Sequence, residues 1–375
     1  MRTRPVVHVI SGLGVGGAEG SLVQVATRLK ARGVPQHVVC VGALDDYTDE
    51  LRSREVEVTV LGVINAVRLP FGIGRMACLI RELDPAVVQG WMYHGNILAA
   101  LAHRLAGRRD GRRLYWNLRA SNVDDERYGR VLRIGALMSG WPDLVIANSQ
   151  AGAKFHIDRG FRPRRIDVIR NGVDTQKFRP DAGARASLRA ELGIPADAVV
   201  AIHAARVDPM KDHALVLAAI AALPHVHGLF AGAGTERLTV PQNVRALGVR
   251  HDLPRLYAAA DIVISSSAFA EGFSNVIAEG MSAGLVPVAT DVGDAREIIG
   301  DVGYVVPARD VAKMTAAFAA AAREPAPERA SRGLRARERI MERFPLGAMV
   351  DAYARVYESG LASASRTAYA KHPAL

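Results

Sequence analysis

Short runs of apolar residues alternate along the chain with longer segments whose apolar positions recur at helical spacing. Val6–Ile10 is the first such run, and a glycine-rich stretch separates it from a predicted helix over Ala18–Lys30. The apolar positions of this helix are Leu22, Val25, Ala26 and Leu29. They share one helical face, and Gly33 follows as a stop signal.

The alternation continues and predicts parallel strands joined by helices, because short β-rich runs separated by helical segments are typical of βαβ units. The further predicted strands are Val38–Val41, Ala86–Gln89, Arg113–Asn117, Leu144–Ala147, Asp167–Ile169, Val199–Ala204, Gly228–Ala231, Asp261–Ser265 and Val286–Ala289. Helical segments between them include Ile97–Arg104, Ala214–Leu223 and Val311–Ala322.

The pattern restarts after the stretch NGVDTQKFRP at residues 171–180, which predicts an α/β protein of two doubly wound parallel-sheet lobes. We place the N-terminal lobe at residues 1–172 and the C-terminal lobe at 173–345. A last helix, Leu346–Tyr357, is expected to pack back on the N-terminal lobe, and Gly360–Leu375 to form a frayed tail. Ligands of such sheets bind beyond the carboxyl ends of the strands, so we expect the site in a cleft between the lobes.

Composition favours a soluble cytoplasmic protein. The 375 residues are 49% hydrophobic and 23% charged, as in ordinary globular domains. The longest uncharged stretch, Pro85–His103, is broken by polar residues and does not read as a membrane span. Cys40 and Cys78 are too few for a disulfide framework or a zinc site. The apolar run after Arg2 and Arg4 is too short for a signal peptide.

The excess of positive over negative charge is confined to the first half of the chain. The net charge is +10, and residues 1–180 hold 27 Lys and Arg against 17 Asp and Glu, whereas the rest hold 21 against 21. Arginine is densest in Arg104–Arg113 and Arg159–Arg170. A solubilising surface explains this simply. The alternative is an anionic partner, such as the inner face of the plasma membrane or a lipid-linked substrate. Few aromatics accompany the arginines, which argues against nucleic acid.

The glycines of Gly12–Gly17 match G-x-G-x-x-G between a strand and a helix, where backbone amides can face a phosphate. A dinucleotide site also needs an acidic residue at the end of the second strand, and Asp45 and Asp46 come late. A tight turn with no ligand explains the glycines as well.

Two further motifs lie in the second lobe. Arg206 and Lys211 follow a strand and could bind a diphosphate, although two loop cations are more often solvated. Glu271 and Glu279 flank a predicted helix start near Ser274–Asn275. The free amides of that helix start attract anions, while a carboxylate can grip a sugar diol. The simpler alternative is a helix-start acid and a solvated glutamate.

Together these segments resemble retaining glycosyltransferases of family 4, which have the GT-B fold of two facing lobes. The resemblance rests on GVGGAE, NGVD, ARVDPMKD, FAGAG and EGFSNVIAEGMSAGLVPVATDVG, and runs from about Val6 to Ala322. Glu271 and Glu279 match the family's E-x7-E signature. The stretches Trp91–His94 and Trp116–Asn122 are similar to bacterial enzymes that build O-antigen or capsule-type polysaccharides. Asp208-Pro209-Met210 departs from the family pattern where the family varies.

The resemblance implies a role for each matching residue. Arg206 and Lys211 would bind the diphosphate of a nucleotide sugar, and Glu271 would hold hydroxyls of the donor sugar. Glu279 would bind the ribose, and His94 would stand near the reacting sugar, although such a histidine is more often structural. The backbone groups implied in donor binding are those of Gly16, Gly17, Gly232, Ser274, Asn275 and Val276.

The implied reaction is transfer of a sugar, with retention, to a glycan or polyprenyl-linked acceptor in cell-envelope polysaccharide synthesis. No Asp-x-Asp occurs in the sequence, so we expect cations and backbone dipoles, and no metal, to stabilise the leaving diphosphate. Three alternatives stay open: a sugar-nucleotide epimerase of the same fold, a nicotinamide oxidoreductase, and a non-catalytic sugar-binding protein. The side chains do not specify the base, the sugar or the acceptor.

Overall fold

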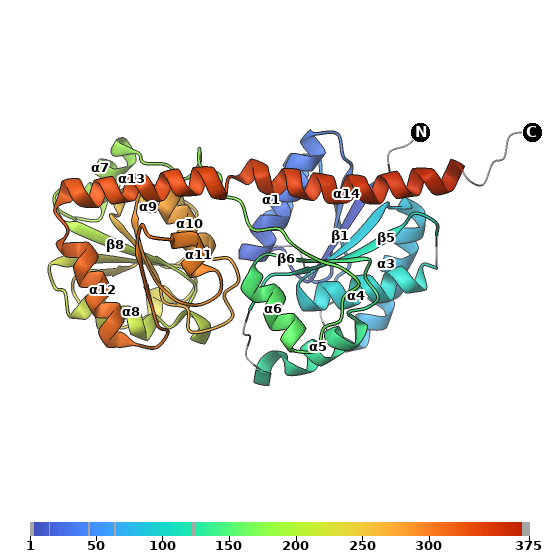
Figure 1. The fold of residues 1–375 in the computed structure, drawn as a ribbon, viewed down its shortest axis with the longest axis horizontal. Helices are drawn as coiled ribbons and strands as arrows, with labels where there is room; N and C mark the ends of the chain where they lie inside the picture. Colours follow the sequence, from blue (N-terminus) through green and yellow to red (C-terminus); the bar gives the residue numbers. More distant parts are fainter. Residues whose placement is uncertain are drawn as a thin grey trace, which may run out of the picture. The chain divides into compact units, whose positions relative to one another are not determined.

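The computed structural model describes residues 4–14, 16–43, 46–63, 65–107, 109–121, 123 and 125–369. The chain divides into two compact units (Figure 1). The first unit comprises Met1–Arg119, Asp124–Arg170 and Gly347–Leu375. The second unit comprises Ala120–Val123 and Asn171–Leu346. Within the described residues, no helix combines the length and the apolar content needed to cross a bilayer.

The first unit is built on a seven-stranded, all-parallel sheet in the order β3-β2-β1-β4-β5-β6-β7. Its strands are β1 (Val6–Ile10), β2 (Gln36–Cys40), β3 (Glu57–Val60), β4 (Val87–Trp91), β5 (Arg113–Leu118), β6 (Leu144–Ala147) and β7 (Ile166–Val168). From β1 the chain adds strands toward one edge of the sheet, and from β4 it adds them toward the other edge. The loops that follow β1 and β4 therefore lie side by side.

Helices cover both faces of this sheet (Figure 1). They are α1 (Gly17–Ala31), α2 (Tyr47–Ser53), η1 (Ala66–Arg68), α3 (Leu69–Leu83), α4 (Met92–Leu105), α5 (Asp125–Met138) and α6 (Gln150–Asp158). Helix α1 buries the face predicted from its spacing, including Leu22, Val25 and Leu29. Because β1 is buried along its whole length, helix and strand share one apolar layer.

The last helix, α14 (Leu346–Tyr369), contacts the first sheet through two buried tyrosines. The Asn117 amide donates to the Tyr353 hydroxyl at 2.6 Å, and the Tyr357 hydroxyl donates to Gln89 at 2.8 Å. The helix continues ten residues into the segment predicted as a tail. That part of the prediction is wrong because the alanine-rich sequence after Gly360 favours helix. Residues 370–375 lie outside the described part of the chain.

The second unit holds a six-stranded, all-parallel sheet in the order β10-β9-β8-β11-β12-β13. Its strands are β8 (Val199–Ala204), β9 (Val226–Ala231), β10 (Val244–Ala246), β11 (Ile262–Ser265), β12 (Val286–Thr290) and β13 (Tyr304–Val306). Its helices are α7 (Ala182–Glu191), η2 (Pro209–Lys211), α8 (His213–Ala221), η3 (Thr235–Arg237), α9 (Leu253–Ala259), α10 (Asn275–Ser282), α11 (Ala295–Ile299), α12 (Val311–Arg323) and α13 (Ala326–Arg343).

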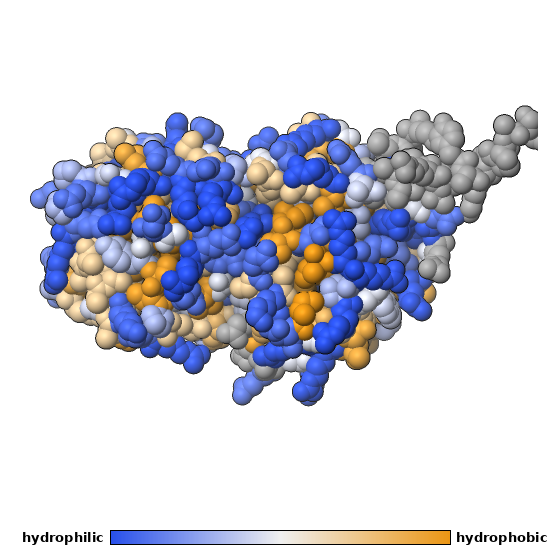
Figure 2. Space-filling model, in the orientation of Figure 1, coloured by the Kyte–Doolittle hydropathy of each residue, from blue (hydrophilic) through white to orange (hydrophobic). Residues whose placement is uncertain are grey.

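Two apolar clusters, one on each face of the second sheet, form the core of this unit. Helix α13 joins one of them through Ala336 and Ile340, and Gly333 is buried on the same helical face. A hydrophilic surface covers most of the outer side of α13 (Figure 2). This amphipathic division explains why a helix with so many arginines and glutamates is stable on the sheet.

The predicted fold class is confirmed, and the predicted strands are confirmed with shifts of at most two residues at their ends. Helix α4 begins five residues before the predicted Ile97. The bounds of β1, β6 and β8 are those that the apolar runs predict. The prediction missed β3, β10 and β13, which are all edge strands of three or four residues. Short, half-exposed edge strands carry little apolar signal.

Candidate functional site

A buried ion pair joins two loops at the carboxyl edge of the second sheet. The Lys211 ammonium donates to the Glu271 carboxylate at 2.5 Å, and both side chains are more than four-fifths buried. Lys211 ends η2, which follows β8, whereas Glu271 follows β11, the neighbouring strand. Parallel pairing of these strands therefore brings together two residues predicted separately from the sequence.

The Glu271 carboxylate is ionised although it is buried. Burial alone would raise its pKa, but the Lys211 ammonium, the Ser267 hydroxyl and the Arg206 charge together lower the pKa of Glu271 below its ordinary value. The Ser267 hydroxyl donates to the same carboxylate oxygen as Lys211, at 2.7 Å. The Glu271 carboxylate is therefore stabilised by two cations, Lys211 and Arg206, to which an anionic ligand can also bind.

Arg206 remains available to a ligand. Its side chain is 54% exposed, and its guanidinium lies 3.4 Å from Asp208. Asp208 is already engaged, because its other oxygen accepts from the Met210 amide at 3.0 Å and so caps the start of η2. The structure thus places both predicted cations beside Glu271.

Hydrogen bonds between the loops hold this arrangement in place. The Ser266 hydroxyl donates to the carbonyl of Lys211 at 2.6 Å, and the Ala268 amide donates to the carbonyl of Met210 at 2.8 Å. The Thr290 hydroxyl donates to the carbonyl of Ser267 at 2.7 Å. The loops after β8 and β11 and the last residue of β12 are therefore held together, which preorganises the charged groups.

Two glycines allow the backbone to approach closely at this edge. Gly232 has φ +143°, and a Cβ there would lie 2.3 Å from the carbonyl oxygen of Ala205, next to Arg206. Gly293 has φ +64°, and a Cβ there would lie 2.4 Å from the carbonyl oxygen of Glu271. Gly232 was a predicted site residue, whereas the sequence analysis missed Gly293. Its position in the loop that follows the predicted strand Val286–Ala289 was the available signal.

Helix α10 starts where the sequence predicts and directs its amino end to the same edge. Ser274 is its N-cap residue, and the first amides of the helix, at Asn275 and Val276, have no partner within the helix. The Asn171 side-chain amide donates to Asn275 at 2.7 Å and fixes that side chain. The first turn of α10 therefore offers backbone donors with a positive dipole to an anion.

Glu279 lies one turn further along α10 in a different electrostatic environment. Burial raises the pKa of Glu279 to about 7, although the Tyr257 hydroxyl and the Lys177 charge oppose this rise. The Tyr257 hydroxyl donates to the carboxylate at 3.2 Å. The pKa values of the two glutamates of the E-x7-E motif are therefore shifted in opposite directions. This difference in pKa arises from tertiary contacts alone. Tyr257 is a residue of the site that the sequence analysis missed.

The predicted residues of the first unit lie at the carboxyl edge of its own sheet. Gly16 is the extended N-cap of α1, and a Cβ there would lie 2.2 Å from the Glu19 carboxylate. Gly17 is the first residue of the helix and is exposed. Glycine at position 16 is therefore explained by a close approach within the turn, while the amide of Gly17 remains accessible.

His94 lies in the first turn of α4, and its side chain is exposed. Close packing requires glycine at nearby positions, because a Cβ on Gly95 would lie 2.6 Å from the carbonyl oxygen of Val9. A Cβ on Gly90 would lie 2.4 Å from the Cα of Asn96. The glycines around His94 therefore let α4 approach the sheet, and His94 itself is left facing solvent.

Arg119, at the end of β5, is a residue of this edge that the sequence analysis did not single out. It is buried, donates to the Ser21 hydroxyl at 2.6 Å and lies over the Trp91 ring at 5.2 Å. Burial lowers the pKa of Arg119. Ser21 belongs to α1, so this arginine ties the helix that follows the glycine loop to the sheet.

In the second unit the arrangement fits one kind of ligand: a group with clustered negative charge and hydroxyls. Arg206, Lys211 and the α10 amides can bind a diphosphate, and the two glutamates can accept from sugar hydroxyls. The described residues include no group of three or more His, Cys, Asp and Glu side chains placed to hold a metal ion.

The two units match two glycosyltransferase family models. Residues 15–177 match Glycosyltransferase Family 4, and residues 198–324 match Glycosyl transferases group 1. A D-inositol 3-phosphate glycosyltransferase of Mycobacterium sp. (strain KMS) is 34% identical over 188 residues, covering 45% of this chain and 42% of that protein. The corresponding protein of Saccharomonospora viridis is 33% identical over 236 residues, covering 55% and 53%. The chain thus matches about half the length of these curated relatives.

Solved structures of the same fold match almost the whole chain. Anabaena Alr3699/HepE in complex with UDP and glucose has a TM-score of 0.83 at 24% identity and covers 95% of this chain and 100% of that one. Sucrose-phosphate synthase from Thermosynechococcus elongatus has a TM-score of 0.81 at 19% identity and covers 96% and 100%. These likenesses identify the GT-B fold.

Proposed function

Since this chain belongs to the GT-B glycosyltransferases, with a family 4 domain at residues 15–177 and a group 1 domain at residues 198–324, we propose that it transfers a sugar from a nucleoside diphosphate sugar to an anionic acceptor. The observation that carries the proposal is the Lys211–Glu271 pair with Arg206 beside it. Breaking the bond between sugar and nucleotide places negative charge on the diphosphate, and preorganised cations stabilise that charge.

Each group has a step in this proposal. Arg206, Lys211 and the amides of Asn275 and Val276 bind the diphosphate, and Glu271 accepts from hydroxyls of the donor sugar. When the diphosphate draws Lys211 toward itself, the Glu271 carboxylate is released to orient the sugar. Glu279, in its ionised form, accepts from both ribose hydroxyls. Gly232 lets the nucleotide approach the backbone beside Arg206.

We expect transfer with retention and without a metal ion, because organic cations and backbone amides supply the charge that a metal provides in other transferases. Turnover that survives EDTA supports this, and turnover that EDTA abolishes and Mg²⁺ restores would refute it. The anomeric configuration of the product, measured by NMR, tests retention. We also propose that the backbone amides of Gly16 and Gly17 and the side chain of His94 lie beside the donor sugar.

A uridine donor is the first to test, since the Anabaena protein of the same fold is described with UDP and with UDP-glucose. A thermal-shift screen over UDP, GDP, ADP and their sugars identifies the base, because a ligand that binds the folded state raises Tm. Product analysis without acceptor distinguishes the alternatives. An epimerase would convert the donor sugar, whereas a transferase releases only a little free sugar.

The acceptor is proposed to be anionic because the excess of arginine lies in the first 180 residues. Two acceptor classes fit: a polyprenyl diphosphate-linked glycan of the cell envelope, and a phosphorylated polyol like that named for the mycobacterial relatives. Transfer assays with each class separate them. Transfer at equal rate to a neutral polyol would contradict the charge argument.

Exposed apolar residues on α5 support contact with a membrane surface. Leu137 is 85% exposed and Ile134 is 47% exposed, and both lie on a helix with the exposed arginines Arg130 and Arg133. This combination is typical of helices that lie in the headgroup region. Leu137→Glu should reduce co-sedimentation with anionic vesicles, and unchanged co-sedimentation would argue against this contact.

A further inference from the structure

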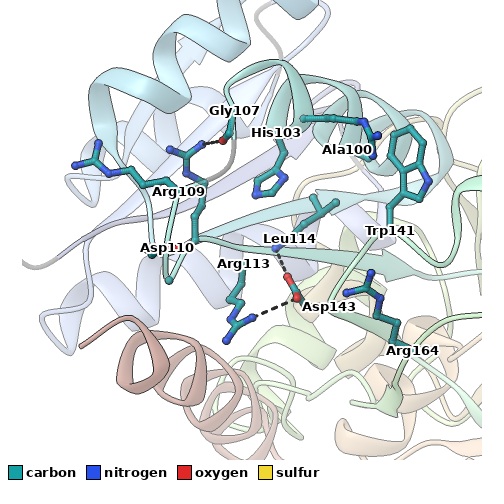
Figure 3. Close-up of a pocket in the computed structure, with 13 residues that line it drawn as sticks. Ala100, His103, Gly107, Arg109, Asp110, Arg113, Leu114, Trp141, Asp143 and Arg164 are labelled. Atoms are coloured by element: carbon teal, nitrogen blue, oxygen red, sulfur yellow. Dashed lines mark hydrogen bonds and ion pairs between the residues drawn. The ribbon is translucent and has the colours of Figure 1, made fainter. Parts of the chain in front are cut away.

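The first unit contains a pocket of about 740 Å³ at the amino ends of β5 and β6 (Figure 3). Arg113 begins β5, Asp143 directly precedes β6, and His103 lies in the last turn of α4. The carboxyl edge with Gly16 and Gly17 is at the other end of these strands. With about 3.3 Å per residue, the length of β5 alone separates the two edges by roughly 17 Å. The pocket is therefore distinct from the site described above.

Arginine dominates the lining of this pocket. Five arginines and two aspartates line it, and we call it the arginine pocket after Arg104, Arg109, Arg112, Arg113 and Arg164. Figure 3 shows Arg109 on one side and Arg164 with Trp141 on the other, with His103 and Leu114 between them. The hollow is thus enclosed by positive charge from more than one direction.

The carboxylates near the pocket are already engaged. Asp143 accepts from the Leu114 amide at 3.0 Å and from Arg113 at 3.4 Å (Figure 3). Asp84 is shared by three guanidinium groups. They belong to Arg4 at 3.0 Å, Arg109 at 3.2 Å and Arg112 at 3.8 Å. One carboxylate cannot neutralise three guanidinium groups, so positive charge remains.

Arg112 is the strongest sign of a missing ligand. Its side chain is only 2% exposed, and its Nη1 donates to the carbonyl of Gly107 at 3.2 Å. Its Nε has no hydrogen-bond partner among the described residues. Burial lowers the pKa of Arg112 despite Asp84, and the charges of Arg4, Arg109 and Arg81 lower it further. A buried, crowded cation with an unused donor is costly unless an anion binds it.

The rest of the lining offers further contacts to the same ligand. The Nε2 of His103 is buried and has no hydrogen-bond partner in the part of the chain that the structure describes. Burial and the charge of Arg112 lower the pKa of His103 to about 4. The neutral ring can therefore donate to or accept from an uncharged part of a ligand. Arg104 is held over the Trp141 ring at 4.8 Å, while Arg164 has no ionic partner among the described side chains.

We propose that the arginine pocket is a second anion site, which binds a phosphate or diphosphate group. Guanidinium groups form paired hydrogen bonds with phosphate oxygens, and a cluster of them matches a multiply charged ligand better than a single carboxylate. The volume suits a phosphate with a small attached group. Such a group is either a soluble phosphorylated compound or the headgroup of an anionic lipid.

Calorimetric titration of the full chain with inorganic pyrophosphate, at constant ionic strength, tests whether the pocket binds phosphate groups, which both kinds of ligand carry. The exposed rim arginines are changed together, as Arg104→Ala with Arg164→Ala, because Arg112→Ala could unfold the protein. Pyrophosphate affinity at this site should fall roughly 10-fold or more, since charge-assisted hydrogen bonds are lost. Arg52→Ala, at an exposed arginine of α2 outside the pocket, is the matched control.

Arg206→Ala in the second unit reports separately on the donor site. If pyrophosphate binding responds to Arg206→Ala and not to the rim pair, the second site does not exist and the proposed function stands. If it responds to the rim pair and not to Arg206→Ala, the second site stands and the diphosphate role of Arg206 fails. Binding that responds to neither change overturns both proposals.

Vesicles distinguish the two sources of phosphate. The full chain is sedimented with phosphatidylcholine vesicles and with vesicles that also contain phosphatidic acid. Binding to the second kind that the rim pair abolishes, but Arg52→Ala does not, assigns the pocket to a lipid headgroup. Pyrophosphate binding without such sedimentation assigns it to a soluble ligand. If neither probe binds in a manner that depends on Arg104 and Arg164, the proposal is wrong.

Discussion

The Lys211 ammonium lies 2.5 Å from the Glu271 carboxylate, although the two residues are 60 positions apart in the chain. Strand pairing brings them to one sheet edge, and Ser267 shares the carboxylate. Glu271 serves here as the ionic partner of Lys211, the cation that binds the diphosphate in the proposed reaction. Exchange of one anionic partner for another would then couple donor binding to the position of Glu271.

Removal of the Arg206 guanidinium should slow transfer without unfolding the protein. We expect Arg206→Ala to lower kcat by about 10²–10³-fold, comparable to the loss of one preorganised donor. Tm should be nearly unchanged because the side chain is 54% exposed. Steady-state kinetics and thermal unfolding measure the two effects. Arg237→Ala, at an exposed arginine of the same unit, serves as control, and near-wild-type transfer by Arg206→Ala would exclude the diphosphate role.

The Lys211–Glu271 pair predicts a non-additive effect on stability. Lys211→Met leaves the buried Glu271 carboxylate without its main partner and should cost about 3 kcal/mol of unfolding free energy. Adding Glu271→Gln removes that charge and should recover most of the loss, while activity stays low in both variants. Urea unfolding of the single and double variants measures the coupling. Strictly additive losses would mean that the two side chains do not interact in solution.

The raised pKa of Glu279 predicts a pH dependence of donor binding. Since the ionised form accepts from both ribose hydroxyls, the donor KM should fall as the pH rises through about 7. Glu279→Gln should raise KM and flatten this profile, with a smaller effect on kcat. Glu236→Gln, at a half-exposed glutamate of the same unit, is the control. A profile that keeps its slope in Glu279→Gln would assign the titration to another group.

The raised pKa of Glu279 also makes the free energy of unfolding depend on pH. The folded protein keeps the Glu279 proton up to pH values near 7, whereas the unfolded chain loses it near the ordinary value of 4.5. Stability from this group is therefore present at low pH and declines as the pH rises from about 4.5 to about 7. Unfolding free energies of the wild type and Glu279→Gln across this range should converge at low pH.

Gly232 should tolerate no side chain. A Cβ at Gly232 meets the Ala205 carbonyl oxygen, and the residue has φ +143°. Gly232→Ala should therefore displace the backbone before Arg206, lower stability by about 1–3 kcal/mol and weaken UDP binding. Gly347→Ala is a matched control in α14, where a Cβ meets nothing within 4 Å. Thermal unfolding with and without UDP measures both effects. If UDP raised the Tm of Gly232→Ala as much as that of the wild type, the proposed approach of the nucleotide to the backbone at Gly232 would be contradicted.

Local sequence was sufficient for most strands and for the helix start at Ser274. Apolar runs such as Val199–Ala204 mark buried parallel strands because burial on both faces needs apolar residues throughout. Edge strands such as β3 lacked this signal because one side faces solvent. Candidate residues after strands, such as Arg206 and Glu271, were found for the same reason, since the loops at the carboxyl edge follow from a parallel sheet.

The chain's own order of residues therefore determined two wound sheets and the loops that carry the candidate chemistry. Only the tertiary structure decided which of these side chains meet, that the pKa of Glu271 is lowered while that of Glu279 is raised to about 7, and that arginines of several elements enclose a pocket at the amino edge of the first sheet. Periodicity is a property of neighbouring residues and can be read locally. Contact, burial and pKa depend on residues distant in the chain, and these come together only when the sheets form.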